Sequence, residues 1–283
     1  MQSPVQLPKR LADTHKGTYG HVFVIGGSLG LTGAVCLCAN AALRMGAGLV
    51  TVGIPRSLNH IFEIKLTEVM SFPLPDKSGN LTQNAFKQIN TFSNKASVIV
   101  LGPGAGHNSH TQKLIAKIIK NSNKPLVVDA DGINALALHP EVLRNRKTED
   151  IILTPHLGEF SRLIKLNKEK IKAKRKSLVK ETSLRYNLSL VLKGNHTLVS
   201  DGRELFENLT GNPGMATAGM GDVLTGIIAG LIAQGLSCFE AAKLGVYLHG
   251  LAGDLAVEDK TQNCLIASDV IEYLPRAIKA SKF

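Results

Sequence analysis

The segment with the clearest chemical character is Gly211–Gly226, which reads GNPGMATAGMGDVLTG and runs into an apolar stretch. A glycine-rich loop of this kind leaves backbone N–H groups unpaired at the start of a helix, where these donors and the helix dipole bind phosphate. Gly219 and Gly221 favour a close approach of the anion, because a Cβ at either position would obstruct it. The segment therefore predicts a phosphate-binding loop.

Asp222 stands where the helix after this loop is expected to begin. Aspartate at such a position commonly caps the helix. A carboxylate beside a bound phosphate is unfavourable, however, unless it has a task such as accepting a proton from an attacking hydroxyl group. The residue types alone leave both roles open, a helix cap and a general base in phosphoryl transfer.

A second glycine-rich stretch lies near the N-terminus, where Lys16–Gly20 (KGTYG) leads into an apolar run and then into Gly26–Gly33 (GGSLGLTG). Dinucleotide-dependent dehydrogenases have a similar turn, but they carry an acidic residue at the end of the second strand. The corresponding stretch, Gly48–Ser57 (GLVTVGIPRS), contains no Asp or Glu. Hydride transfer by a bound dinucleotide is therefore disfavoured.

Polar groups also follow four other apolar runs. The stretches concerned are Gly102–Gly106 (GPGAG), Asp129–Asn134 (DADGIN), Thr154–Glu159 (TPHLGE) and Lys193–Thr197 (KGNHT). In an open parallel sheet, ligands bind in the crevice at the carboxyl ends of the strands, so these stretches are expected to converge. Asp131 and Glu159 are candidates to orient magnesium or phosphate, or to cap helices. Lys193 and Thr197 are candidates to hold a nucleotide.

Buried strands that alternate with helices would bring these stretches together. Near-continuous apolar runs predict strands at His21–Gly26, Leu49–Ile54, Ser97–Gly102, Leu126–Asp129, Ile151–Thr154 and Leu188–Lys193. Helix-length segments fall at Thr32–Met45, Asn84–Ser93, Ser109–Asn121, Phe160–Tyr186 and Ser268–Lys279, with Gly235 as a stop between two further helices. The pattern predicts an α/β fold with a mostly parallel sheet.

An antiparallel edge is expected after this alternation. Thr197–Ser200 and Glu204–Glu207 flank the turn residues Asp201 and Gly202, which is typical of a strand, a tight turn and a second strand. No linker, repeat or low-complexity segment divides the chain. One domain over residues 1–283 is therefore expected.

The composition limits the partners of the chain. Its 283 residues carry a formal charge of +11, which indicates an anionic partner. Much of the excess lies between Lys165 and Lys180, where apolar residues recur at roughly helical intervals and no aromatic residue is interleaved, so a solvated helix face is favoured over nucleic-acid binding. The apolar stretches Leu31–Ile54 and Gly226–Leu236 are interrupted or too short to span a membrane. A cytoplasmic protein without an export signal is expected.

The four cysteines lack paired C-x-x-C spacing, which disfavours a zinc site. A chain of this length also does not need disulfides to stabilise a core. Buried, reduced thiols are expected.

Taken together, the motifs resemble the NAD(P)H-hydrate dehydratase family of the ribokinase-like superfamily. They are KGTYG…VIGGS…TGA, ALRMGAGLV, LGPG, DADGINAL, LTPHLGE, KGNHT and GNPGMATAGMGDVLTGIIAG, in matching order and spacing from about Lys16 to Leu251. The resemblance implies a three-layer α/β/α domain. It also implies that ADP or ATP, with Mg²⁺, phosphorylates the C6 hydroxyl of the S epimer of hydrated NADH or NADPH. Elimination of phosphate then restores the ring.

The resemblance also assigns roles to individual positions. Asp222 matches the residue that deprotonates the hydroxyl, and Gly219 and Gly221 match the backbone anion hole. The nucleotide-contacting segment corresponds to Lys193, Gly194, Asn195, His196 and Thr197, together with Gly221. Contacts with the hydrated dinucleotide correspond to Ala41, Gly104, His156 and Asp222. Glu159 matches a residue that arranges magnesium indirectly.

Longer members of the family carry an amino-terminal epimerase domain, for which 283 residues leave no room. A separate epimerase is therefore the expected pathway partner, and the resemblance suggests a homotetramer. Two alternatives stay open, a small-alcohol kinase of the same superfamily and a catalytically silent nucleotide-binding protein. The LTPHLGE and KGNHT segments argue against the kinase, and retention of Asp222 within an intact glycine loop argues against the silent protein.

Overall fold

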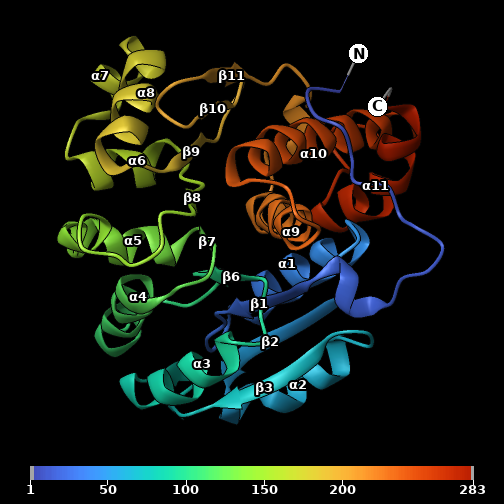
Figure 1. Ribbon diagram of the computed structural model, residues 1–283. Helices are drawn as coiled ribbons and strands as arrows, with labels where there is room; N and C mark the ends of the chain where they lie inside the picture. The colour runs from blue at the N-terminus through green and yellow to red at the C-terminus, as the bar shows by residue number, and fades with distance from the viewer. Residues whose placement is uncertain (1–2, 282–283) are drawn as a thin grey trace.

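The central feature of the computed structural model, which describes residues 3–281, is a nine-stranded sheet between two layers of helices (Figure 1). The strands are β1 His21–Ile25, β2 Leu49–Pro55, β3 Met70–Leu74, β6 Val98–Leu101, β7 Leu126–Val128, β8 Ile151–Leu153, β9 Ser189–Leu192, β10 Leu198–Ser200 and β11 Leu205–Glu207. Their order is β11-β10-β9-β8-β7-β6-β1-β2-β3, and all neighbours from β9 to β3 are parallel. The expected mostly parallel sheet is confirmed.

The strands are apolar because helices cover both faces of the sheet. In β1, Val22 and Val24 belong to one buried cluster, whereas Phe23 and Ile25 belong to the other. Successive side chains of a strand point to opposite faces, so a strand buried on both faces needs apolar residues at every position.

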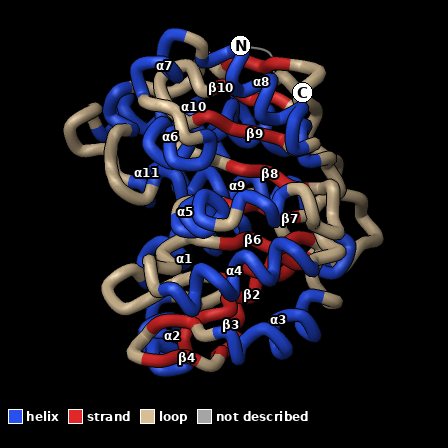
Figure 2. The backbone as a smooth tube through the Cα atoms, turned by 90° about the vertical axis from the view of Figure 1, so that its left-hand side faces the viewer, coloured by secondary structure: helices blue, strands red, loops and turns tan. Residues whose placement is uncertain are grey.

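The helices divide between these two faces (Figure 2). One layer contains α1 Thr32–Arg44, α2 Asn59–Lys65, α9 Met220–Ala233, α10 Cys238–Lys260 and α11 Ala267–Ala280. The other contains α3 Phe86–Ser93, α4 Ser109–Asn121, α5 Asp131–Leu138, α6 Leu157–Ile164, α7 Lys168–Ala173 and α8 Arg175–Tyr186. The expected three-layer α/β/α fold is therefore present.

The order in which strands are added to the sheet reverses at β1. The chain adds β2 and β3 on one side of β1 and then β6, β7 and later strands on its other side. Val22 of β1 is in register with Val50 on one side and with Val98 on the other. In open α/β sheets a ligand crevice forms at the carboxyl ends of the strands beside such a reversal. The turn after β1 and the loops after β6, β7 and β8 therefore open at the same edge.

Helix α9 lies against α1 at unusually short range. A Cβ at Gly226 would lie only 2.1 Å from the carbonyl oxygen of Cys38, and one at Gly230 only 2.8 Å from that of Ala42. Glycine is needed where two backbones approach so closely. This contact fixes α9, the helix that carries the residues of the predicted phosphate loop.

The antiparallel edge predicted after residue 193 is present, since β10 pairs antiparallel with both β9 and β11. The single helix predicted over Phe160–Tyr186 is wrong, because α6, α7 and α8 replace it. Lys165 ends α6 in the left-handed conformation, with φ of 56°. The side chain of Asn167 then caps α7 by accepting a hydrogen bond from the amide of Lys170. These two residues give the physical reason for the break.

Sequence reasoning also missed β3, an edge strand that contains Pro73 and has a partly exposed face. It missed a separate antiparallel hairpin as well, formed by β4 Asp76–Lys77 and β5 Asn80–Leu81. A short strand that is covered on one face lacks the continuous apolar run by which the buried strands were found.

All four thiols are free, and Cys36 and Cys38 are buried as expected, but Cys264 is exposed. The expectation of buried thiols is wrong for Cys264, which lies in the exposed connection between α10 and α11, and Cys238 is only partly buried. Among residues 3–281, no helix combines the length and the apolar character that crossing a membrane would require.

Candidate active site

The predicted phosphate loop leads into α9, with Gly219 at the N-cap and Asp222 at the third helical position. Gly219 has a φ of 89° and no side chain caps this helix end. The capping interpretation of Asp222 is therefore wrong. The first amide groups of α9 have no partner within the helix, which makes them available to an anion.

The carboxylate of Asp222 lies in an environment that favours its protonated form. Burial and, after it, the nearby carboxylate of Asp129 raise its pKa to about 7, although Lys193 opposes the shift. Among residues 3–281, the side chain of Asp222 has no hydrogen-bond or ion-pair partner at hydrogen-bonding distance. A carboxylate with a pKa near neutrality and a free oxygen is suited to accept a proton.

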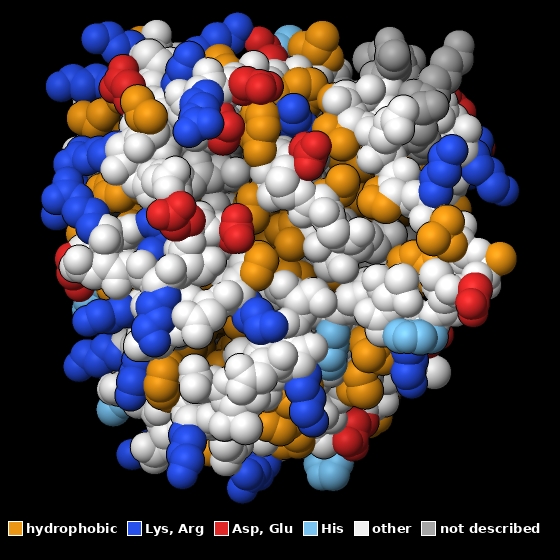
Figure 3. All heavy atoms as spheres, viewed as in Figure 1, with side chains coloured by type: hydrophobic (Ala, Val, Ile, Leu, Met, Phe, Trp, Pro, Cys, Tyr) orange, Lys and Arg blue, Asp and Glu red, His pale blue; other side chains and the backbone are white. Residues whose placement is uncertain are grey.

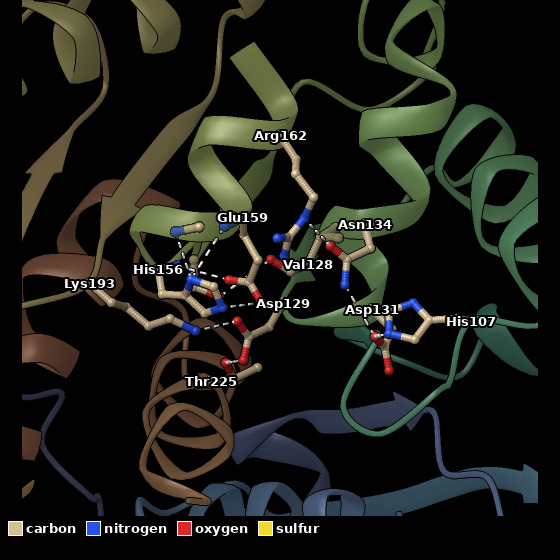
Figure 4. A network of polar contacts seen from close by, with 12 residues as sticks. His107, Val128, Asp129, Asp131, Asn134, His156, Glu159, Arg162, Lys193 and Thr225 are labelled. Carbon is tan, nitrogen blue, oxygen red and sulfur yellow. Dashed lines mark hydrogen bonds and ion pairs between the residues drawn. The ribbon is translucent and has the colours of Figure 1, made fainter. Parts of the chain in front are cut away.

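Asp129, at the carboxyl end of β7, organises the neighbourhood of Asp222 (Figure 4). It is only 1% exposed. One carboxylate oxygen accepts a hydrogen bond of 2.7 Å from Nζ of Lys193, and the other accepts one of 2.8 Å from Oγ1 of Thr225 in α9. Asp129 thereby joins β7, β9 and α9.

Sequence reasoning missed Asp129, although it stands at the end of a predicted strand. Asp131, two residues later, was selected instead. The available signal was that only Asp129 directly follows the continuous apolar run of β7. An acidic residue at that position ends beside the ligand crevice of a parallel sheet.

Lys193 follows β9, and its side chain is directed inward to Asp129 (Figure 4). A Cβ at Gly221 would lie 3.1 Å from Nζ of Lys193, so the ammonium group lies beside the glycine loop. Although burial lowers the pKa of Lys193, the carboxylates of Asp129 and Glu159 raise it above its ordinary value. The side chain therefore places a permanent positive charge next to the unpaired amides of α9.

The remainder of the KGNHT segment faces solvent. Oγ1 of Thr197 donates a hydrogen bond of 2.9 Å to the carbonyl oxygen of Gly194, which closes the turn. The guanidinium group of Arg175, from α8, donates to the carbonyl oxygens of Asn195 and His196 at 3.1 and 3.2 Å. Lys193 of this segment thus points inward, whereas the rest of the segment forms an exposed loop that is held by Arg175.

His156 and Glu159 lie beside this network and form a capping box at the start of α6. Nδ1 of His156 accepts hydrogen bonds from the amides of Gly158 and Glu159 at 2.9 and 3.2 Å, so the proton of the neutral ring lies on Nε2. Oε2 of Glu159 accepts a hydrogen bond of 2.8 Å from the amide of His156. Burial lowers the pKa of His156 and raises that of Glu159.

Asp131 binds the loop after β6. One of its carboxylate oxygens accepts a hydrogen bond of 2.8 Å from the amide of Gly106, and the other accepts one of 3.2 Å from the side chain of Asn134. Nε2 of His107 lies 3.5 Å from that second oxygen. Asp131 therefore orders two of the predicted polar strand ends.

Comparison with known proteins shows the family to which this chain belongs. The family model described as NAD(P)H-hydrate dehydratase matches residues 22–276. The chain belongs to the NAD(P)H-hydrate dehydratase family. An ADP-dependent (S)-NAD(P)H-hydrate dehydratase from Neisseria meningitidis is 37% identical over 264 residues, which cover 91% of this chain and 84% of the relative.

Other members of the dehydratase family are longer. A bifunctional NAD(P)H-hydrate repair enzyme from Moorella thermoacetica is 43% identical over 97% of this chain and 52% of its own length. The chain thus spans about half the length of the bifunctional relatives that it matches. A Bacillus subtilis ADP/ATP-dependent NAD(P)H-hydrate dehydratase, co-crystallised with ATP/Mg²⁺, superposes with a TM-score of 0.83 at 29% identity, covering 96% of this chain and 94% of the other.

Two positions that the dehydratase resemblance assigned to substrate lie at different depths. Gly104 is in the loop after β6, with a φ of 57°, and its carbonyl oxygen accepts a hydrogen bond from Ser28. Ala41 is fully buried in α1, and a Cβ at Gly226 would lie 2.9 Å from its methyl group. The side chain of Ala41 therefore has no exposed surface for a ligand, and its contact with substrate stays a prediction.

The carboxylates of Asp129 and Glu159 fit a magnesium ion that is bound mainly by nucleotide phosphates. Among residues 3–281, no three His, Cys, Asp or Glu side chains are clustered so as to hold a metal ion by themselves. Asp129 is paired with Lys193 and Thr225, and Glu159 is hydrogen-bonded to His156. Magnesium in phosphoryl transfer is usually bound by one or two carboxylates together with phosphates and water. This donor set fits an ion that arrives with nucleotide phosphates.

Proposed function

We propose that this chain uses ADP or ATP to dehydrate the S epimer of hydrated NADH and NADPH. The C6 hydroxyl attacks the terminal phosphoryl group and loses its proton to Asp222, while the nucleotide leaves with one phosphate fewer. The C6–O bond then breaks and inorganic phosphate leaves with the electron pair. Loss of a proton from C5 forms the C5=C6 double bond and restores the dihydronicotinamide ring.

The observation that carries this proposal is the position and state of Asp222. It stands within the first turn of α9, beside amide groups suited to bind a phosphoryl group, and its pKa is about 7. A base with this pKa is available at neutral pH and can still hold the proton that it has accepted. A carboxylate used only for structure has no need of a buried position without hydrogen-bond partners.

The remaining residues position phosphate and substrate in this proposal. The amides around Gly219 and Gly221 bind the transferring phosphoryl group, and the ammonium group of Lys193 balances its charge. The exposed Gly194–Thr197 loop contacts the nucleotide. Gly104 and His156 contact the hydrated dinucleotide from the loops after β6 and β8. In each case the support is the convergence of these elements at one edge of the sheet.

Magnesium accompanies the nucleotide phosphates in this proposal. Glu159 would help to hold the ion indirectly, and the ion would supply positive charge at the transferring phosphoryl group. The support is the pair of carboxylates, Asp129 and Glu159, beside the glycine loop.

We further propose a cytoplasmic homotetramer whose pathway partner is an epimerase that interconverts the two hydrate epimers. Exposed apolar side chains on the described surface support an oligomer, and they include Leu29, Leu31, Ile61, Ile64 and Met70. Molar mass measured by light scattering tests the tetramer.

The first experiment incubates the purified chain with hydrated NADH, Mg²⁺ and either ADP or ATP. Regenerated NADH is followed by its near-ultraviolet absorbance. We expect a nucleotide-dependent rise, and the more effective nucleotide identifies the phosphoryl donor. A stable phosphorylated product without a rise would indicate the alternative, a small-alcohol kinase, and no turnover with bound nucleotide would indicate a silent binding protein.

A further inference from the structure

A surface groove of about 610 Å³ has His156 and Glu159 in its lining, whereas Asp222 does not line it. Beyond these two residues its lining includes His107, Gln112, Asn134, Leu138 and Arg162, from α4, α5, α6 and the loop after β6. Its volume is in the range of sites that bind small molecules. The reaction proposed above does not use the part of the groove beyond His156.

Arg162 is the cationic residue of this groove with free donors. Its Nε donates a hydrogen bond of 3.0 Å to Oδ1 of Asn134, which fixes the guanidinium group at the groove wall (Figure 4). Within residues 3–281, this is the hydrogen bond that Arg162 makes, and its two terminal amino groups have no other partner at bonding distance. A planar guanidinium group with two free amino groups is suited to bind a phosphate through two hydrogen bonds.

The acidic residues of the neighbourhood do not neutralise this donor. Glu159 has a side chain only 6% exposed and is hydrogen-bonded to the amide of His156. Asp131 accepts hydrogen bonds from Gly106 and Asn134. Both carboxylates therefore have partners other than Arg162, whose terminal amino groups stay open to the groove.

The lining of the groove also contains one exposed, large apolar side chain. Leu138, at the end of α5, is 60% exposed although it is surrounded by polar lining residues. An exposed apolar side chain beside a free guanidinium group is complementary to a ligand that combines a flat apolar ring with a phosphate.

We infer that this groove binds the phosphate-bearing part of the hydrated dinucleotide, with Arg162 on a phosphate and Leu138 against the adenine ring. The inference rests on the proposed function, because His156 then contacts the dinucleotide between the groove and Asp222. The phosphate has two possible sources in such a ligand, the pyrophosphate bridge and the 2′-phosphate of the NADPH form. Both offer the same paired oxygen acceptors.

Steady-state kinetics of Arg162→Gln with both hydrated dinucleotides test the inference and separate the sources. We expect kcat to stay within about twofold of the wild-type value and KM to rise about tenfold, the effect of losing roughly 1.4 kcal/mol of uniform binding. Equal increases for the two hydrates identify the pyrophosphate, and an increase confined to the NADPH form identifies the 2′-phosphate. Unchanged KM values for both substrates would overturn the inference.

Two further variants distinguish binding in the groove from a general effect on the fold. Leu138→Glu adds a negative charge at an exposed position and is expected to raise the same KM values without lowering the melting temperature. Arg185→Gln, which removes an exposed arginine of α8 outside the groove, is expected to leave them unchanged. A fall in kcat with constant KM for Leu138→Glu would contradict the assignment.

Direct binding keeps this inference separate from the proposed function. NADPH, the unhydrated form, is titrated and its own fluorescence is followed for the wild type and Arg162→Gln. If Arg162→Gln binds NADPH more weakly than the wild type but the wild type does not dehydrate hydrated NADH, the groove assignment holds and the proposed function is rejected. Equal affinities, or no NADPH binding by the wild type, would reject the groove even if dehydration is observed.

Discussion

At the scale of single residues, Asp222 is expected to trade stability for activity. Asp222→Asn should lower kcat by about 10²–10⁴, the usual contribution of a general base, with nucleotide affinity largely preserved. Turnover of hydrated NADH and nucleotide binding by calorimetry measure the two effects. Near-normal turnover by this variant would show that another group accepts the proton.

The same substitution should change stability with pH. The folded-state pKa of Asp222, about 7, lies above its ordinary value of 3.8, so the folded protein retains a proton that the unfolded chain releases between these values. Wild-type stability therefore falls as pH rises through that window. Above pH 7 we expect Asp222→Asn to be more stable by about 1–4 kcal/mol, with the advantage vanishing below pH 4. Urea unfolding at pH 4 and pH 8 measures the difference, and equal stability at pH 8 would refute this electrostatic account.

Asp129 should set the pH at which Asp222 becomes active. Its negative charge raises the pKa of Asp222, whereas Lys193 lowers it. Asp129→Asn removes the repulsion and releases the ammonium group toward Asp222, so the acidic limb of kcat/KM should move down by about one pH unit. Thr225→Val, which removes a hydrogen bond to Asp129 but no charge, serves as the control. If the acidic limb of kcat/KM for Asp129→Asn stays at the same pH or moves to a higher pH, Asp129 does not have this role.

At the scale of elements, α8 is expected to brace the exposed Gly194–Thr197 loop, which the proposed function assigns to nucleotide binding. Arg175 donates hydrogen bonds to two carbonyl oxygens of that loop, and His196 within it has a φ of 54°, an unfavourable conformation for a residue other than glycine. Arg175→Ala should therefore raise the KM for nucleotide about three- to tenfold, with little change in kcat. Lys180→Ala, at an exposed position of the same helix, is the matched control. Equal KM values for the two variants would show that the bracing has no part in nucleotide binding.

The basic surface has a related explanation at this scale. Lysine and arginine side chains gather along the edge formed by the α4–α8 layer (Figure 3). Lys176 forms an ion pair of 2.7 Å with Glu207, which also contacts His196 in the Gly194–Thr197 loop. The positive charge of α8 thus lies beside this loop, where it would favour the approach of the anionic nucleotide of the proposed function. An isolated solvated helix face, as expected from the sequence, describes only part of this surface.

At the scale of the whole molecule, features could be predicted where a local stretch of sequence carries their pattern. The strands were predicted because both of their faces are covered, which demands unbroken runs such as Val98–Leu101. The glycine loop was predicted because the local sequence alone defines it, whereas the role of Asp222 as a base rests on the family resemblance and stays a prediction. Asp129 was missed because its partners, Lys193 and Thr225, are 64 and 96 residues away, and no local pattern encodes such a contact.

Bound nucleotide should raise the free energy of unfolding, because its proposed site is built from elements that are distant in the sequence. The proposed nucleotide site draws on the loop after β9 and on α9, so binding stabilises only the folded arrangement that joins them. With Mg²⁺ and ADP at about 100 times the Kd, the free energy of unfolding should rise by about 2.7 kcal/mol, which raises the melting temperature by roughly 5 °C. Lys193→Ala, measured against its own nucleotide-free baseline, should lose most of this shift at the same ADP concentration, because the cation beside the glycine loop is gone. Lys168→Ala, at an exposed position of α7, should retain it. A full shift in Lys193→Ala, together with lost turnover, would assign the ammonium group to the transferred phosphoryl group alone and not to nucleotide affinity.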